Sequence, residues 1–211
     1  MPPIISPYED VPVEKWPEIT SKVIAAHPLA TKELVQVVLT AWTELHATRI
    51  GNRKLQIGRD IFPNPQILGF FMHELIPVEL AAEHPELWRR EKEKGERDLV
   101  FIPDPKFSVE IKTSSHASQI FGNRSYAQPP AAGKVGQKGR AGYFLTVNFV
   151  AKKEAGDGKI TRIRFGWLDH SDWVGQTSES GQQAHLTANS DRYKLVQIYP
   201  VAAAAVKASE G

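Results

Sequence analysis

The segment DLVFIPDPKFSVEIK, residues 98–112, decides the predicted fold. It contains one apolar run, Leu99–Ile102, and one segment in which the apolar residues Phe107, Val109 and Ile111 alternate with polar residues, and the turn-forming residues Pro103–Lys106 separate the two. Short apolar runs on either side of a turn rich in Pro and Asp are typical of a β-hairpin. We therefore expect two antiparallel strands here.

The register of this hairpin brings two carboxylates together. If Ile102 pairs with Lys106 across the turn, the same register places Asp98 opposite Glu110. Two carboxylates and a backbone carbonyl, such as that of Ile111, are the hard oxygen ligands that Mg²⁺ prefers. The hairpin therefore predicts a Mg²⁺ site with Asp98, Glu110 and Ile111 as ligands.

A basic side chain stands beside this predicted site. Side chains alternate along a strand, so Glu110 and Lys112 share one face while Val109 and Ile111 share the other. Lys112 could position or help to deprotonate an attacking water and offset negative charge in a transition state. The alternative is an ion pair between Glu110 and Lys112 on a solvated sheet surface.

The acid-x-Lys tripeptide is weak evidence by itself, because it occurs three times in the chain. The copies are Asp104–Lys106, Glu110–Lys112 and Asp157–Lys159. Pro interrupts the first copy and Gly the third, and both residues are typical of turns. Only the second copy lies in a strand pattern.

Helices are predicted before this hairpin. Apolar spacing indicates helices over Trp16–His27, over Thr31–Thr48 with Thr31 as the N-cap, and over Gln66–Leu80 with a kink at Pro77. The charged run Trp88–Arg97 is interpreted as the solvated face of a helix.

Strands are predicted after the hairpin. They cover Tyr143–Ala151, Ile160–Leu168 and Tyr193–Tyr199, with a turn at Gly156–Gly158. Helices followed by strands predict a layered α/β (α+β) domain.

Length and composition narrow the class of protein. A chain of 211 residues with 41% hydrophobic and 24% charged residues is typical of one globular domain. It has no cysteine, which excludes thiol nucleophiles and cysteine-ligated metal centres. No long apolar run or signal-type N-terminus is present, so we expect a soluble, cytoplasmic protein.

Positive charge is concentrated in the middle of the chain. Residues 112–164 carry ten basic and two acidic side chains, whereas residues 1–111 carry 13 and 17. Lys and Arg bind phosphates, and Arg, Asn and Gln can read base edges, so this segment favours a DNA partner over a merely flexible surface loop. The predicted DNA-contacting residues are Ser114, Ser115, His116, Gln119, Asn123, Arg124, Tyr126, Gln128, Lys134, Lys138 and Arg140.

Asp98, followed after eleven residues by Glu110-Ile111-Lys112, resembles the PD-(D/E)XK nuclease signature. Arg97 stands where that family often has Pro. The continuation from Thr113 to Tyr126 is similar to type II restriction endonucleases of the ScaI-like group. The resemblance covers roughly residues 66–165.

This resemblance implies a central mixed β-sheet flanked by helices, Mg²⁺-dependent hydrolysis of double-stranded DNA at specific sequences, and a homodimer. It also implies an additional glutamate from an upstream helix, for which Glu74 is our first choice and Glu79 the second. The alternative is that both are solvent-facing helix residues. Trp16 and Trp42 are either dimer-interface or core residues.

The resulting prediction is a single nuclease domain over residues 1–211. It comprises an N-terminal helical part (1–65), a catalytic core (66–165), C-terminal strands (166–201) and a frayed tail (202–211). The predicted catalytic residues are Asp98, Glu110, Lys112 and Glu74. Two alternatives remain: a nuclease of the same fold without sequence selectivity, and a DNA-binding module without catalysis.

Overall fold

The structure is a computed structural model that describes residues 5–128, 141–151, 158–178 and 181–200. Its α-helices are α1 (Trp16–Ala25), α2 (Thr31–Ala47), α3 (Pro65–Glu83) and α4 (Ala188–Tyr193). Its strands are β1 (Trp88–Arg90), β2 (Leu99–Phe101), β3 (Val109–Ser114), β4 (Phe121–Asn123), β5 (Gly142–Val150), β6 (Lys159–Leu168), β7 (Trp173–Gly175), β8 (Gln183–Leu186) and β9 (Leu195–Tyr199). Short 3-10 helices lie at Val13–Lys15, Pro105–Phe107, Arg124–Ala127 and His170–Asp172.

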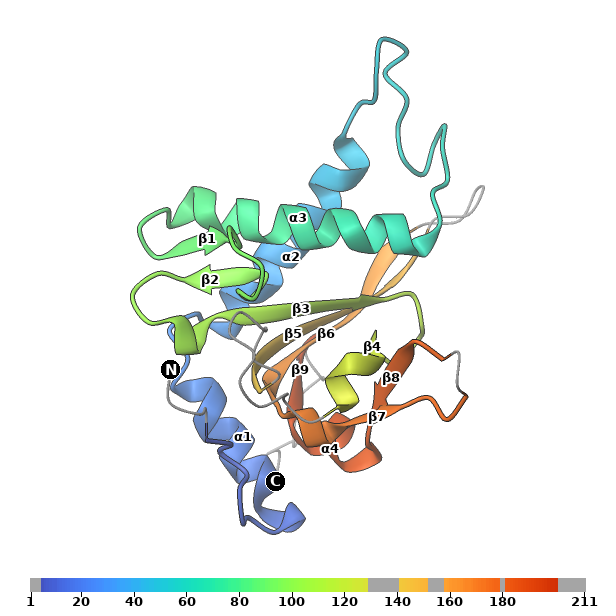
Figure 1. The fold of residues 1–211 in the computed structure, drawn as a ribbon. Coiled ribbons are helices and arrows are strands. Elements are labelled where there is room, and N and C mark those ends of the chain that lie inside the picture. The colour runs from blue at the N-terminus through green and yellow to red at the C-terminus, as the bar shows by residue number, and fades with distance from the viewer. Residues whose placement is uncertain (1–4, 129–140, 152–157, 179–180, 201–211) are drawn as a thin grey trace, which may run out of the picture.

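A mixed sheet of six strands forms the centre, in the order β1-β2-β3-β5-β6-β9 (Figure 1). Strand β3 pairs with β5 in parallel, and the other neighbours pair antiparallel. The strands β4, β8 and β7 form a second, smaller sheet. The predicted α/β fold with a central mixed sheet flanked by helices is therefore confirmed.

The two faces of the central sheet pack against different layers. Tyr143, Leu145 and Val147 of β5 belong to the same buried cluster as Leu68 and Met72 of α3. Between them in sequence, Phe144 belongs to a second cluster together with Trp173 of β7 and Leu186 of β8. This alternation buries both faces of β5, and Figure 1 shows α3 and the small sheet on opposite sides of β3.

Helix α3 covers the sheet beside β3 and forms one wall of the site described below. The Asn64 side chain caps its N-terminus by accepting a hydrogen bond from the Ile67 amide at 3.2 Å, and Pro65 occupies the first turn. The helix continues through the buried Pro77 to Glu83, three residues beyond the predicted end.

The interpretation of Trp88–Arg97 as a solvated helix face is wrong. Trp88 is buried and begins β1, which pairs with β2. Within β1, Arg89 donates hydrogen bonds to Glu96, and these lower the pKa of Glu96 to about 2. The charged residues of this run therefore lie in a short strand and in the turn after it. Arg97, the last residue of the run, is buried.

Three local predictions need smaller corrections. The N-cap of α2 is Ala30 rather than Thr31, which is already helical. Phe107 lies in a 3-10 helix, where the Asp104 side chain caps the Lys106 amide, and not in a strand. Tyr193 ends α4, so the last strand begins only at Leu195.

Some predictions concern residues outside the described ranges. These are most of the turn at Gly156–Gly158, the tail 202–211 and the basic residues Lys134, Lys138 and Arg140. Within the part of the chain that the structure describes, none of the helices has the length and apolar character needed to span a bilayer. Trp42 is buried in the core, and Trp16 is partly buried and packs against this core.

Candidate active site

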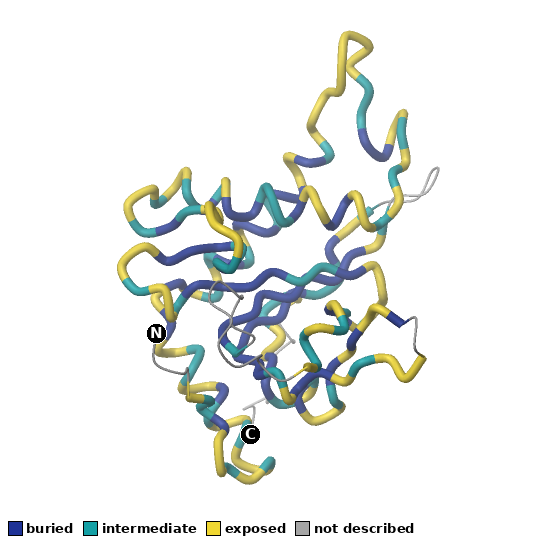
Figure 2. The backbone as a smooth tube through the Cα atoms, in the orientation of Figure 1, coloured by how far each residue is buried: buried dark blue, intermediate teal, exposed yellow. Residues whose placement is uncertain are grey.

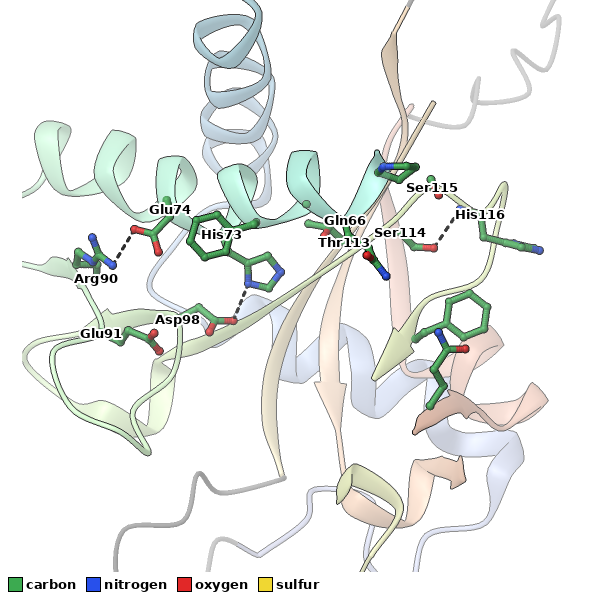
Figure 3. A pocket seen from close by; sticks show the side chains of 15 residues that line it. Gln66, His73, Glu74, Arg90, Glu91, Asp98, Thr113, Ser114, Ser115 and His116 are labelled. Atoms are coloured by element: carbon green, nitrogen blue, oxygen red, sulfur yellow. Dashed lines mark hydrogen bonds and ion pairs between the residues drawn. The ribbon is translucent and has the colours of Figure 1, made fainter. Parts of the chain in front are cut away.

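A cleft of about 860 Å³ lies between α3 and the edge of β3 (Figure 3). One side comes from the first half of α3 and the other from the ends of β1 and β3. Its lining includes Gln66, Gly69, His73, Glu74, Arg90, Glu91, Asp98, Thr113, Ser114, Ser115, His116, Phe121 and Gln183. Two of the predicted catalytic residues, Asp98 and Glu74, therefore face this space.

The predicted register of the hairpin is confirmed at one pair, whereas the expected pairing of Ile102 with Lys106 is not formed, because Lys106 lies in the 3-10 helix Pro105–Phe107. Leu99 of β2 pairs with Val109 of β3, so the preceding Asp98 stands opposite Glu110. Strand β2 extends no further along β3, and the Asp98 carboxylate instead accepts a hydrogen bond from the Ile111 amide at 2.7 Å. This bond holds Asp98 at the edge of β3.

Glu110 and Lys112 share one face of β3, as strand alternation predicts. The Lys112 Nζ atom donates to Glu110 Oε1 at 2.6 Å. Val109 and Ile111 point to the other face, into the cluster that contains α3. The pair is buried rather than solvated, since only 2% of the Glu110 side chain and 14% of the Lys112 side chain are exposed.

Two further residues surround the Glu110 carboxylate. Tyr126 donates its hydroxyl hydrogen to Oε1 at 2.5 Å, and its ring lies 4.8 Å from the Lys112 Nζ atom. The Arg97 Nη1 atom lies 3.7 Å from Oε2, and Arg97 Nη2 donates to the Ala141 carbonyl oxygen at 2.5 Å. Glu110 is therefore held by two cations and a phenol.

Burial and charge act against each other at this cluster. Burial is the largest single influence on Lys112 and would lower its pKa, but the charges of Glu110, Tyr126 and Asp98, with the hydrogen bond to Glu110, together outweigh it and raise the pKa. Burial lowers the pKa of Arg97, which the Glu110 charge opposes. Burial also raises the pKa of Tyr126, so its phenol stays protonated and can donate to Glu110.

Helix α3 adds polar groups to the cleft. The Glu74 carboxylate pairs with Arg90 at 2.7 Å, and His73 Nδ1 lies 3.6 Å from Asp98 Oδ2 (Figure 3). Val109 and Ile111 separate α3 from the Glu110 face of β3, so Glu74 and Glu110 lie on different sides of the strand. Glu79 does not line the cleft.

The loop after β3 contains several of the predicted DNA contacts. Ser114, Ser115 and His116 line the far end of the cleft (Figure 3), and Gln119, Asn123 and Gln128 are exposed. Arg124 instead donates to the carbonyl oxygens of Ser178 and Gly181. Tyr126 is turned inward to Glu110, so the structure shows an internal contact for it.

Sequence reasoning did not assign Arg97 or His73 to the site. Arg97 was noted only as a departure from the family pattern, although its position directly before Asp98 was a usable signal. His73 directly precedes Glu74, but nothing in the sequence shows that its ring turns towards Asp98. Tyr126 is predicted as a DNA contact. Its actual partner, Glu110, lies sixteen positions earlier, and no local sequence pattern indicates a contact at that separation.

The donor set suits a hard cation. Asp98 and the backbone of Ile111 are joined by a hydrogen bond, and Glu110 directly precedes Ile111, so two carboxylates and a carbonyl oxygen, ligand types that Mg²⁺ accepts, come from neighbouring positions. Asp98 lines the cleft, whereas Glu110 and Lys112 do not. Among the described residues, one group of three acidic or histidine side chains lies close enough to share an ion, namely Glu33, Glu83 and His84. None of these three lines the cleft.

The central mixed sheet places Asp98 at a cleft and Glu110 and Lys112 on the other face of β3, and comparison with known proteins assigns this chain to the class of restriction endonucleases. The family model for the ScaI restriction endonuclease matches residues 6–199. The chain is also 44% identical over 198 residues to the type II restriction enzyme ScaI of Streptomyces caespitosus. The aligned region covers 92% of this chain and 85% of that enzyme. The chain belongs to the ScaI restriction endonuclease family, so the resemblance is confirmed.

Proposed function

We propose that this protein is a Mg²⁺-dependent endonuclease that hydrolyses phosphodiester bonds of double-stranded DNA at a specific sequence. The observation that supports the proposal is the pairing of Leu99 with Val109, next to which Asp98 and Glu110 lie, with Lys112 Nζ 2.6 Å from Glu110. Membership of a restriction endonuclease family supports it independently.

Asp98, Glu110 and the carbonyl of Ile111 would hold the Mg²⁺. Such an ion supplies a nucleophilic water and stabilises the negative charge that develops on a phosphate under attack. Lys112 orients the attacking water and offsets that charge through its ammonium group. The Ile111 amide keeps Asp98 at the edge of β3, and Tyr126 and Arg97 keep Glu110 from turning away.

Glu74 assists from α3 in this proposal. It lines the same cleft as Asp98, but its partner in the structure is Arg90. A DNA phosphate entering the cleft would compete with Glu74 for the Arg90 guanidinium. Glu74 would then no longer be held by Arg90.

The proposed partner is a DNA duplex, bound by a homodimer. A two-fold symmetric dimer matches a palindromic site, so each protomer cuts one strand. Light scattering with and without DNA tests this part, because a strict monomer in both states would contradict it.

Digestion of a long, sequence-diverse duplex tests the function. The protein is incubated with Mg²⁺ or with EDTA, beside the Asp98→Ala and Lys112→Ala variants, and the ends of the products are sequenced. We expect discrete fragments that share one terminal sequence, only with Mg²⁺ and only from the unmodified protein.

The two alternative functions give different results in this assay. A smear with varied ends would identify a nuclease without sequence selectivity. Intact DNA, with binding that weakens steeply with salt and is unchanged in the variants, would identify a binding module.

A further inference from the structure

An arm formed by residues 48–62 projects from the body between α2 and α3 (Figure 1). Its outer part is a tight hairpin, in which Ile50 and Leu55 exchange backbone hydrogen bonds of 2.9 and 3.1 Å. Figure 2 shows that almost all of this outer part is exposed. A protruding hairpin that buries little surface adds little to the core. Binding of a partner is therefore the better explanation for it.

The base of the arm is ordered by its own contacts. Ile57 is only 4% exposed, and the Gln56 amide donates to the Asp60 carboxylate at 2.8 Å. Gln56 also donates from its side chain to the His46 carbonyl oxygen in α2. The base of the arm therefore holds the tip in a defined position relative to α2.

The arm is basic within an acidic half of the chain. Residues 48–62 contain four basic side chains and one acidic side chain, whereas the rest of residues 1–111 contains nine basic and sixteen acidic. A local excess of positive charge on an exposed element favours a polyanionic partner.

The four cations of the arm divide into two pairs. Arg49 donates to carbonyl oxygens at the end of α2, and Arg59 pairs with Asp60 at 2.7 Å, so both act within the protein. Arg53 and Lys54 stand at the exposed tip. No carboxylate among the described residues forms an ion pair with either of them.

The arm borders the surfaces assigned to DNA. Its C-terminal end leads directly into Pro65 and Gln66, which line the cleft. Its base shares a cavity of about 450 Å³ with Gly158, which precedes the exposed Lys159 at the start of β6. The base of the arm therefore lies beside the start of β6, where Lys159 is exposed.

We propose that the arm is a second DNA-binding element, in which Arg53 and Lys54 contact phosphates of the duplex outside the cleft. This inference rests on the proposed function. A second copy of the chain is the competing occupant, because Ile50 and Phe62 of the arm are also exposed. Two adjacent cations at the tip disfavour it, since charged residues are depleted at the centre of protein interfaces.

The test measures DNA affinity against salt concentration, in EDTA so that no cleavage occurs. The variant is Arg53→Gln combined with Lys54→Asn. Asn is chosen because Lys54 has a φ of +52°, a conformation that Asn tolerates well. If each side chain neutralises one phosphate, the slope of log K against log salt becomes shallower by about 1.8.

The matched control removes two exposed cations from the helical side, Lys15→Gln combined with Lys32→Gln. We expect this control to keep the slope of the unmodified protein. An unchanged slope in the tip variant, or an equal change in the control, would overturn the proposal.

Two further measurements separate the remaining explanations. If the tip variant changes the oligomeric state in light scattering while its slope is unchanged, the arm binds a second copy instead. If the unmodified protein neither binds nor cuts DNA, the proposed function itself fails. If the unmodified protein binds and cuts DNA but the tip variant keeps its slope, only the proposal that the arm binds DNA is refuted.

Discussion

At the residue scale, Glu110 has the most constrained environment of the proposed site. Its carboxylate is buried and receives hydrogen bonds from Lys112 and Tyr126, with Arg97 close to the second oxygen. A buried carboxylate keeps its charge only if such partners compensate for lost water. The same partners fix its orientation, which a metal ligand needs.

Removing the Tyr126 hydroxyl tests this orientation. Tyr126→Phe keeps the packing against Trp173 but loses the bond to Glu110. Because a hydrogen bond to a charged group contributes about 1.5–3 kcal/mol, we expect Mn²⁺ binding and kcat to fall about tenfold or more, with KM for DNA little changed.

Tyr199→Phe is the matched control, because no hydrogen bond of the Tyr199 hydroxyl occurs among the described residues. It should leave both quantities unchanged. Unaltered Mn²⁺ binding in Tyr126→Phe would show that the phenol does not position Glu110.

Arg97 is the second residue of this cluster whose substitution should lower the stability of the protein. Arg97→Ala leaves the buried Glu110 with less compensation and removes the hydrogen bond to Ala141. Breaking a buried ion pair commonly lowers stability by about 3 kcal/mol or more. Chemical denaturation should show this loss, whereas Arg90→Ala, at a half-exposed pair with Glu74, should lower it by less than about 1 kcal/mol. Equal effects would contradict a special role for Arg97.

At the element scale, the close approach of α3 to β3 shapes the cleft. A Cβ atom on Gly69 would lie 2.6 Å from Thr113 Oγ1, so glycine is needed for this spacing. Gly69→Ala should therefore destabilise the protein by about 1–2 kcal/mol, although Ala is the better helix former by about 1 kcal/mol.

The Thr113→Ala background separates these two effects. Without the threonine side chain, Gly69→Ala should become stabilising by up to about 1 kcal/mol in thermal or denaturant unfolding. A stabilising effect of Gly69→Ala in both backgrounds would show that α3 does not press on β3 at this point.

His27 joins the turn between α1 and α2 to the hairpin, and it should make stability depend on pH. Its Nε2 atom donates to the Phe107 carbonyl oxygen at 2.9 Å, and burial lowers its pKa. The unfolded chain then takes up a proton near pH 6.5 that the folded protein does not. The free energy of unfolding should therefore fall as pH drops below about 6.5.

The size of this effect is limited to about 1.4 kcal/mol per pH unit. His27→Gln should flatten the dependence between pH 7 and 5, whereas the exposed His185→Gln should keep it. An identical slope in the unmodified protein and His27→Gln would assign the dependence to other groups.

Local patterns predicted some elements and not others. The hairpin register follows from one turn, one apolar run and one alternating segment, and Leu99 pairs with Val109 as expected. Strand β1 has only three residues within a charged run, and its pairing of Trp88 with Phe101 is a tertiary contact. In the small sheet, β4 has three residues and pairs with β8 far along the chain, as in Phe121 with His185, so no local signal predicts this pairing. Strands β7 and β8 are neighbours in sequence, but they have only three and four residues.

At the scale of the whole molecule, two layers meet at β3. Helix α3 supplies Glu74 and His73 on one face, and the small sheet supports Tyr126 and Glu110 on the other. The sequence predicted the part of the site that lies on one hairpin. It could not predict partners that come from other layers, because those contacts depend on packing and not on spacing.

The most direct test of the account compares two acid-x-Lys tripeptides of the same chain. Asp104 and Lys106 form an exposed pair at 2.7 Å in the turn, with the same spacing as Glu110 and Lys112. Single-turnover cleavage of a duplex in Mg²⁺ is measured for Glu110→Gln with Lys112→Met and for Asp104→Asn with Lys106→Met. We predict a loss of about 100-fold or more in the first variant and a rate within about twofold of the unmodified protein in the second. Cleavage at the unmodified rate by the first variant, or an equal loss in both, would contradict the account.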